Sequence, residues 1–202
     1  MFKAFFAATN ASPLDGEDTS LAARDGQTVA EILCSAQSIM PFTVPEAKIA
    51  ATYMSTCHYR ERDVIIQEGG RTELDYLLLI LDGEATFEAS LGGGASKPVM
   101  VRVLGPGAAL GSMSMFDGEP RSLHGIASMP TRCAKLTRVQ LKALCREHPQ
   151  VGVKLMAVIC LNFSQTLREL TIKFKTHVRL NNVLNAELQG SDAQRFNNND
   201  TL

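Results

Sequence analysis

The feature that most constrains this sequence is a series of short apolar segments, separated by glycine-containing turns, between Tyr59 and Leu136. Short runs of β-branched and apolar residues bounded by turn residues are typical of β-strands. The predicted strands are residues 64–66, 76–81, 85–89, 99–104 and 133–136. Because they follow one another without an intervening helical pattern, they favour an antiparallel roll or sandwich.

Helical patterns come before this strand-rich region. After Thr28, a possible N-cap, apolar residues recur at helical spacing until Pro41. Pro45 is suited to the first turn of a second helix. Residues 1–27 show no clear period, and we expect them to form an N-terminal extension, as a surface segment or mobile arm. The sequence therefore places the folded domain at residues 28–148.

A long helix is predicted for residues 149–188, because apolar residues there alternate at spacings of three and four. These residues are Val153, Met156, Cys160, Phe163, Leu167, Leu170 and Phe174. The stripe either packs on its own roll or forms a parallel homodimeric coiled coil, and we interpret the segment as a dimerisation helix. Residues 189–202 are polar and are expected to form a disordered tail.

The stretch 105–123, GPGAALGSMSMFDGEPRSL, carries the chemistry. Its glycines let the backbone turn tightly and present N–H groups toward an anion. Arg121 offers a planar, permanently charged fork that matches a phosphate group, and Ser122 adds a hydroxyl donor. By themselves, these residue types fit either a phosphate-binding segment or a surface turn with a solvated arginine.

The run from about Pro41 to Leu170 resembles the cyclic-nucleotide-binding domains of catabolite-activator-type regulators, kinase regulatory subunits and nucleotide-gated channels. The matching pieces, in chain order, are PFTVPEAKIA, YRERDVIIQEGG, YLLLILDGEATF, LGPGAALGSMSMF with PRSL, and TRCAKLTRVQLKALCREHPQVG. The resemblance implies an α+β fold. Its centre is an antiparallel β-roll, a jelly-roll-like double-stranded β-helix, with N-terminal helices and a long C-terminal helix.

The resemblance also assigns the ligand contacts. In the family, a phosphate-binding cassette of the form Gly-Glu-apolar-small is followed by Arg-(Ser/Ala). The positions that match it here are Gly111, Ser112, Met113, Ser114, Arg121 and Ser122. The family's glutamate, which accepts a hydrogen bond from the ribose 2′-hydroxyl, falls on Ser112.

The resemblance also implies that the base of the nucleotide contacts two further residues. Thr166 matches the position at which catabolite-activator-type proteins offer a helix hydroxyl to the purine, although a plain helix-surface threonine is an equal alternative. Val101, on the strand before the cassette, would give the base an apolar wall or serve in the core.

These features favour a regulatory module that senses a cyclic nucleotide, cAMP or cGMP, and signals through its C-terminal helix to a partner protein. A cyclic dinucleotide also fits Ser112. The alternative is a degenerate, ligand-free domain of the same fold that acts as a dimeric interaction scaffold. Neither interpretation requires a cofactor.

Other function classes are disfavoured. The four histidines are scattered, which argues against a metal site, and no Ser-His-Asp or Cys-His spacing indicates an enzyme. A net charge of −1 gives no overall field toward nucleic acid or membrane. The segment after the long helix does not resemble a helix-turn-helix, so we expect a stand-alone domain without direct DNA binding. We expect the protein to be cytoplasmic, since no apolar run approaches the ~20 residues of a membrane span.

Overall fold

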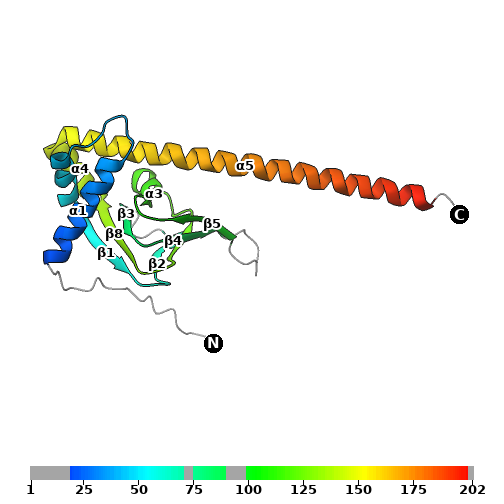
Figure 1. Cartoon of the computed structure of the whole chain (residues 1–202), viewed down its shortest axis with the longest axis horizontal. Helices are drawn as coiled ribbons and strands as arrows, with labels where there is room; N and C mark the ends of the chain where they lie inside the picture. The colour runs from blue at the N-terminus through cyan, green and yellow to red at the C-terminus, as the bar shows by residue number, and fades with distance from the viewer. Residues whose placement is uncertain (1–18, 71–74, 90–98, 200–202) are drawn as a thin grey trace. The chain divides into compact units, whose positions relative to one another are not determined.

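The computed structural model describes residues 19–70, 75–89 and 99–199 (Figure 1). Its internal contacts divide the chain into two units, one ending at Ile159 and one beginning at Cys160. The first unit contains the strands and all helices except the greater part of the last one. The expected domain boundary at residue 148 therefore differs from the contact boundary, because the first turns of the last helix are buried in the first unit, where Lys154 contacts Glu46.

Two antiparallel sheets form the centre of the first unit. Within the described residues there are eight strands, which form two four-stranded sheets of order β1-β8-β3-β6 and β2-β7-β4-β5. The strands are β1 (Ser55–Tyr59), β2 (Val64–Ile66), β3 (Tyr76–Asp82), β4 (Ala85–Ala89), β5 (Val99–Leu104), β6 (Ala109–Leu110), β7 (His124–Ala127) and β8 (Thr131–Thr137). All pairings are antiparallel and the sheets do not close into a barrel, which confirms the predicted antiparallel fold.

The five predicted strands are present, and three further strands were not predicted. These are β1, β6 and β7, which have the sequences STCHY, AL and HGIA. They carry too few apolar residues in a row to show a strand pattern. They form because neighbours in the sheet supply the hydrogen-bond partners of their backbones.

The turn between β3 and β4 is held by a buried threonine. Gly83 has φ +89, and a Cβ there would lie 2.5 Å from the carbonyl oxygen of Pro130, so only glycine fits. Thr131 Oγ1 accepts from the Glu84 amide at 3.1 Å and lies 3.0 Å from the Glu84 carbonyl oxygen. Thr131 is thus a side-chain clamp on the hairpin.

Helix α1 (Thr19–Ser35) begins before the predicted start at Thr28 and ends before Met40. The alanines and leucine that precede Thr28 are strong helix formers, and the Thr28 hydroxyl donates to the Arg24 carbonyl inside the helix instead of capping it. Residues 19–27 of the expected extension are therefore helical, while residues 1–18 lie outside the described residues. The buried carboxylate of Asp25 pairs with Arg132 of β8 and anchors α1 on the first sheet.

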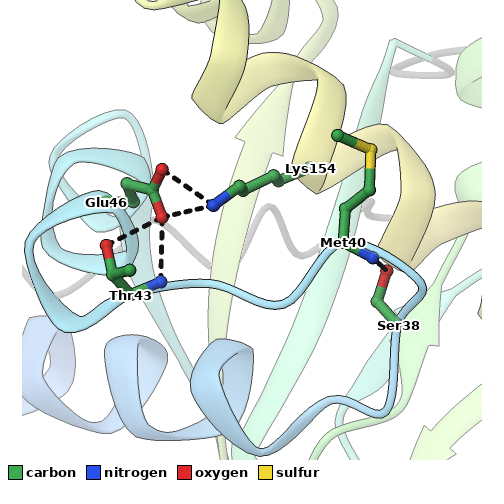
Figure 2. A network of polar contacts seen from close by, with 5 residues as sticks. All are labelled: Ser38, Met40, Thr43, Glu46 and Lys154. Carbon is green, nitrogen blue, oxygen red and sulfur yellow. Dashed lines mark hydrogen bonds and ion pairs between the residues drawn. The ribbon is translucent and has the colours of Figure 1, made fainter.

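Helix α2 (Val44–Thr52) begins next to Pro45, as predicted, and is tied to the last helix by a polar network. Figure 2 shows Lys154 reaching Glu46, with Nζ to Oε distances of 2.8 and 2.6 Å. Glu46 also accepts from the amide of Thr43 at 2.8 Å and from its hydroxyl at 2.7 Å. The bonds from Lys154 and Thr43 lower the pKa of Glu46 to about 2.

A second tie lies at the other end of α2. The Tyr53 hydroxyl donates to Glu147 at 2.6 Å, and its ring lies edge-on to His148, with ring centroids 6.2 Å apart. Glu147 closes helix α4 (Arg138–Glu147), which is followed by α5 (Pro149–Asn199). Both ties thus connect α2 to the region where α4 meets α5.

Helix α5 continues past the Leu188 at which the sequence pattern predicts its end, and reaches Asn199. The segment predicted as a disordered tail from residue 189 is thus helical as far as the structure describes it. The predicted end at Leu188 was simply the last residue of the apolar stripe. Once a helix is established, it extends through polar residues at little cost in free energy. Over the described residues, no helix is long and apolar enough to cross a membrane.

We expect Thr131→Val to lower the free energy of unfolding by about 1–3 kcal/mol, because valine keeps the shape but leaves the Glu84 amide without its acceptor. The midpoint of urea unfolding measures this change. Thr86→Val is the matched control, since the Thr86 hydroxyl contacts Ser128 near solvent and its loss should change stability by at most about 0.5 kcal/mol. Equal midpoints for both variants would contradict the clamp.

We expect Glu46→Gln to reduce the acid sensitivity of folding. The folded pKa of Glu46 is about 2, below its ordinary 4.5, so its contribution is complete above pH 4.5 and is lost as the pH falls toward 2. Unfolding free energies measured across this interval should fall less steeply in the variant than in the wild type. Glu61→Gln, at an exposed position, should retain the wild-type slope; an unchanged slope for Glu46→Gln would refute the ion pair.

Candidate functional site

The predicted cassette folds as a short helix between two glycines. Helix α3 (Ser112–Asp117) follows β6, with Gly111 before it at φ +71 and Gly118 after it at φ +76. The sequence predicts a glycine-rich loop here, whereas in the structure residues 112–117 of that stretch form a six-residue helix. The amides at the start of such a helix have no intrahelical acceptor.

Arg121 lies beneath this helix and is almost completely buried, with 6% of its surface exposed. Its Nη1 donates to the Gly111 carbonyl at 2.5 Å, and its Nη2 donates to the Tyr76 carbonyl at 3.1 Å. The guanidinium carbon also lies 4.8 Å from the centre of the Tyr76 ring. The start of β3 and the start of α3 therefore hold the guanidinium in place together.

Gly111 is required at this contact for two reasons. Its φ of +71 is a conformation that side chains disfavour, and a Cβ there would lie 2.2 Å from Arg121 Nη1. The glycine and the arginine of the predicted cassette thus meet in space, ten residues apart along the chain. This contact places Arg121 at the N-terminal end of α3.

The backbone of Arg121 is fixed as well. Its carbonyl accepts from the Gly69 amide at 2.8 Å, and its own amide donates to the Gly70 carbonyl at 3.4 Å. The Gly69-Gly70 turn that precedes β3 is thereby joined to the end of the cassette. Contacts with the β-roll therefore fix the positions of both the main chain and the side chain of Arg121.

The remaining predicted residues differ in their placement. Ser112 and Ser114 are buried in α3, whereas the Met113 side chain is 57% exposed and Ser122 is exposed beside Arg121. Hence the structure gathers the glycine, the two serines and the arginine of the cassette in one place. Met113 can contribute its backbone there, while its side chain faces solvent.

The two residues assigned to the base belong to other elements than the cassette. Val101 is half-buried on β5, in the second sheet. Thr166 belongs to the second unit of the chain. Their roles in binding therefore stay predictions.

Arg138 was not predicted, yet it connects the cassette to α4. Its Nε donates to the Met115 carbonyl at 2.8 Å and its Nη2 to the Ser114 carbonyl at 3.4 Å. These carbonyls lie toward the C-terminal end of α3, where a cation is favourable. Nothing in the spacing of the sequence indicates that the first residue of α4 would reach back to α3.

A hollow of about 390 Å³ lies between α3, α4 and the first turns of α5. Its lining is mainly apolar, with two cations at its edge. The lining residues are Met115, Phe116, Arg138, Leu141, Lys142, Cys145 and Met156. The hollow is open to solvent, since Phe116, Lys142 and Cys145 in its lining are exposed.

Metal and thiolate chemistry gain no support from the part of the chain that the structure describes. No group of His, Cys, Asp or Glu in it could hold a metal ion. Cys133 lies opposite Cys57 in the β1–β8 pairing, and burial, followed by the charge of Cys57, raises the pKa of Cys133 to about 12. A thiol with this pKa remains protonated and behaves as a core residue.

Comparison with known proteins agrees with this geometry. A family model described as "Cyclic nucleotide-binding domain" matches residues 56–148. A solved cyclic nucleotide-binding domain from Methylobacillus flagellatus is 30% identical, covers 73% of this chain and 81% of its own, and superposes with a TM-score of 0.67. A search of curated proteins finds no match.

More distant structures share the fold. The catabolite activator protein of Thermus thermophilus is 23% identical over 70% of this chain and 62% of its own, with a TM-score of 0.53. The regulatory domain of Toxoplasma gondii PKA, solved with cAMP, is 22% identical over 68% of this chain and 50% of its own, also with a TM-score of 0.53. On the family match and the 30% identical relative, this chain belongs to the cyclic nucleotide-binding domain family, whose members are ligand-binding regulatory modules.

Proposed function

We propose that this protein is a non-enzymatic cytoplasmic sensor that binds a cyclic nucleotide, cAMP or cGMP, at the cassette of α3 and Arg121. The observation that carries the proposal is the buried guanidinium of Arg121, held against Gly111 at the start of α3. Burying a cation is costly, and a site that keeps one at a helix N-terminus is suited to an anion. A cyclic phosphate is an anion of the required size and shape.

In the proposed complex, the planar fork of Arg121 binds the phosphate oxygens. Ser122, exposed beside it, adds a hydroxyl, and Ser114 and the first amides of α3 add short donors. Ser112 replaces the family's glutamate and offers a neutral acceptor to the ribose. This replacement costs about 1–3 kcal/mol and would weaken binding roughly 10- to 100-fold relative to a site with the glutamate.

The base would approach Val101 on β5 and Thr166 on α5. A ligand that contacts both the roll and the helix favours the arrangement in which both contacts are made. Coupling between occupancy and the rest of the protein then follows from this differential affinity. The second contact makes α5 the element that reports occupancy to a partner protein.

Arg138 provides a second connection, within the first unit, through which ligand binding would be transmitted. Because it donates to the carbonyls of Ser114 and Met115, a movement of α3 on ligand binding would be passed to the start of α4. The hollow beside α3 leaves room for such a movement. The end of α4 and the start of α5 are in turn bound to α2 through Tyr53 and Glu46.

The competing function is a ligand-free dimeric scaffold, and the surface of α5 is the observation in its favour. Leu167, Leu170 and Phe174 are 65%, 48% and 69% exposed and follow heptad spacing. We propose that a second copy of the chain covers this stripe in a parallel coiled coil. Homodimer formation is compatible with either function, whereas ligand binding distinguishes them.

We expect Arg121→Lys to weaken binding of cAMP or cGMP by about 10- to 100-fold, because lysine keeps the charge but loses the bidentate fork. Calorimetric titration measures this loss, with AMP as the non-cyclic comparison ligand. Arg146→Lys, at an exposed position, is the matched control and should bind as the wild type does. Saturable binding to the wild type supports the sensor, and a folded wild type that binds no cyclic nucleotide leaves the scaffold function.

We expect the wild type to be a dimer in sedimentation-velocity measurements and the double variant Leu170→Glu with Phe174→Glu to be a monomer. The two glutamates place like charges at facing seam positions, which opposes pairing. Arg179→Glu, at a heptad position on the side away from the seam, should remain dimeric. A monomeric wild type would contradict the coiled coil.

A further inference from the structure

The hollow between α3, α4 and the first turns of α5 has the size of a small-molecule site. Its volume of about 390 Å³ lies within the ~300–1,000 Å³ typical of ligand pockets, which are mainly apolar and carry a few polar groups that orient the ligand. Among the described residues, its lining contains neither Arg121 nor any other residue assigned to the phosphate. The hollow is therefore a separate space from the candidate cyclic-nucleotide site.

The floor of the hollow is apolar and adaptable. Met115 and Leu141 are buried, and Met156 is half-buried. Methionine is unbranched and polarizable, so two of these three side chains can adjust their shape to an apolar ligand. An apolar chain that enters the hollow would leave water for an apolar surface, which is favourable.

Helix α4 places two cations on the face that lines the hollow. Arg138 and Lys142 are four residues apart, which puts them one turn apart on the same side of the helix. Arg138 is fixed by its bonds to the carbonyls of Ser114 and Met115, while Lys142 is exposed. In the part of the chain that the structure describes, the lining contains no Asp or Glu, and neither cation forms an ion pair with a carboxylate. The edge of the hollow is thus positive and its floor is apolar.

We propose that the hollow binds a small amphipathic anion, with its apolar chain on the floor and its anionic head group beside Arg138 and Lys142. Binding here does not require a cyclic nucleotide. An ion pair near solvent strengthens binding by about fivefold or less, whereas burial of each methylene group strengthens it about fourfold. The apolar chain therefore supplies most of the affinity, and the two cations select the sign of the charge.

Titration calorimetry of the wild-type chain with hexanoate, octanoate and decanoate tests the apolar part of the site. Each ligand adds two methylene groups to the one before, so the affinity should rise about tenfold at each step, with one saturable site per chain. Equal affinities for the three carboxylates, or no saturable binding, would exclude a ligand site in the hollow. Because the titrations contain no cyclic nucleotide, either result leaves the proposed sensor function untouched.

Lys142→Met tests the charge, because it removes the ammonium group and keeps the apolar stem. The wild type should bind octanoate about three- to fivefold more tightly than octanol. The variant should lower this preference to about twofold or less and bind octanol as the wild type does, while Lys142→Arg should retain the preference. Lys48→Met, at an exposed position on α2, is the matched control and should behave as the wild type does.

A further variant separates the hollow from the exposed apolar stripe of α5. Leu170→Glu with Phe174→Glu makes that stripe charged and should bind octanoate as the wild type does. Circular dichroism spectra and urea midpoints confirm that each variant is folded. If folded Lys142→Met keeps the wild-type preference for octanoate, or if the double variant loses octanoate binding, the ligand does not lie in the hollow.

Discussion

The contact between Arg121 and Gly111 is the constraint on which the rest of the site depends. Burying an arginine to 6% exposure costs free energy that hydrogen-bond acceptors must offset, and the carbonyls of Gly111 and Tyr76 supply two such acceptors. The same contact leaves no space for a side chain at position 111 and forces the left-handed turn that starts α3. Fold and site are thus determined by the same atoms, which is why the cassette glycine and arginine occur together.

The sequence predicted those strands and turns that are determined by a short run of neighbouring residues. The strands β2, β4 and β5 have the predicted bounds, because each is an apolar run that ends at turn residues or polar residues. The hairpin at Gly83 followed from the turn pair itself. Strands β1 and β7 could not be found in this way, since their sequences, STCHY and HGIA, contain no apolar run.

The residues of the candidate site likewise fall into those that the sequence predicted and those that it missed. Gly111, Ser112, Ser114 and Arg121 were found through their resemblance to a family cassette, and the structure brings them together. Tyr76 and Arg138 were missed, because their contribution depends on contacts between elements that are distant in sequence. Nothing in the local sequence distinguishes Arg138 from other surface arginines.

Helix α1 has a consequence for how the domain should be delimited. The family match begins at residue 56, but Arg132 of β8 is paired with the buried carboxylate of Asp25, far outside that match. Val29, Ala30 and Leu33 of the same helix are also buried. A fragment trimmed to the family boundaries would expose an apolar surface and would leave Arg132 with Asp82 but without its buried partner Asp25, a change that promotes aggregation. The autonomous folding unit is therefore larger than the region that sequence homology identifies.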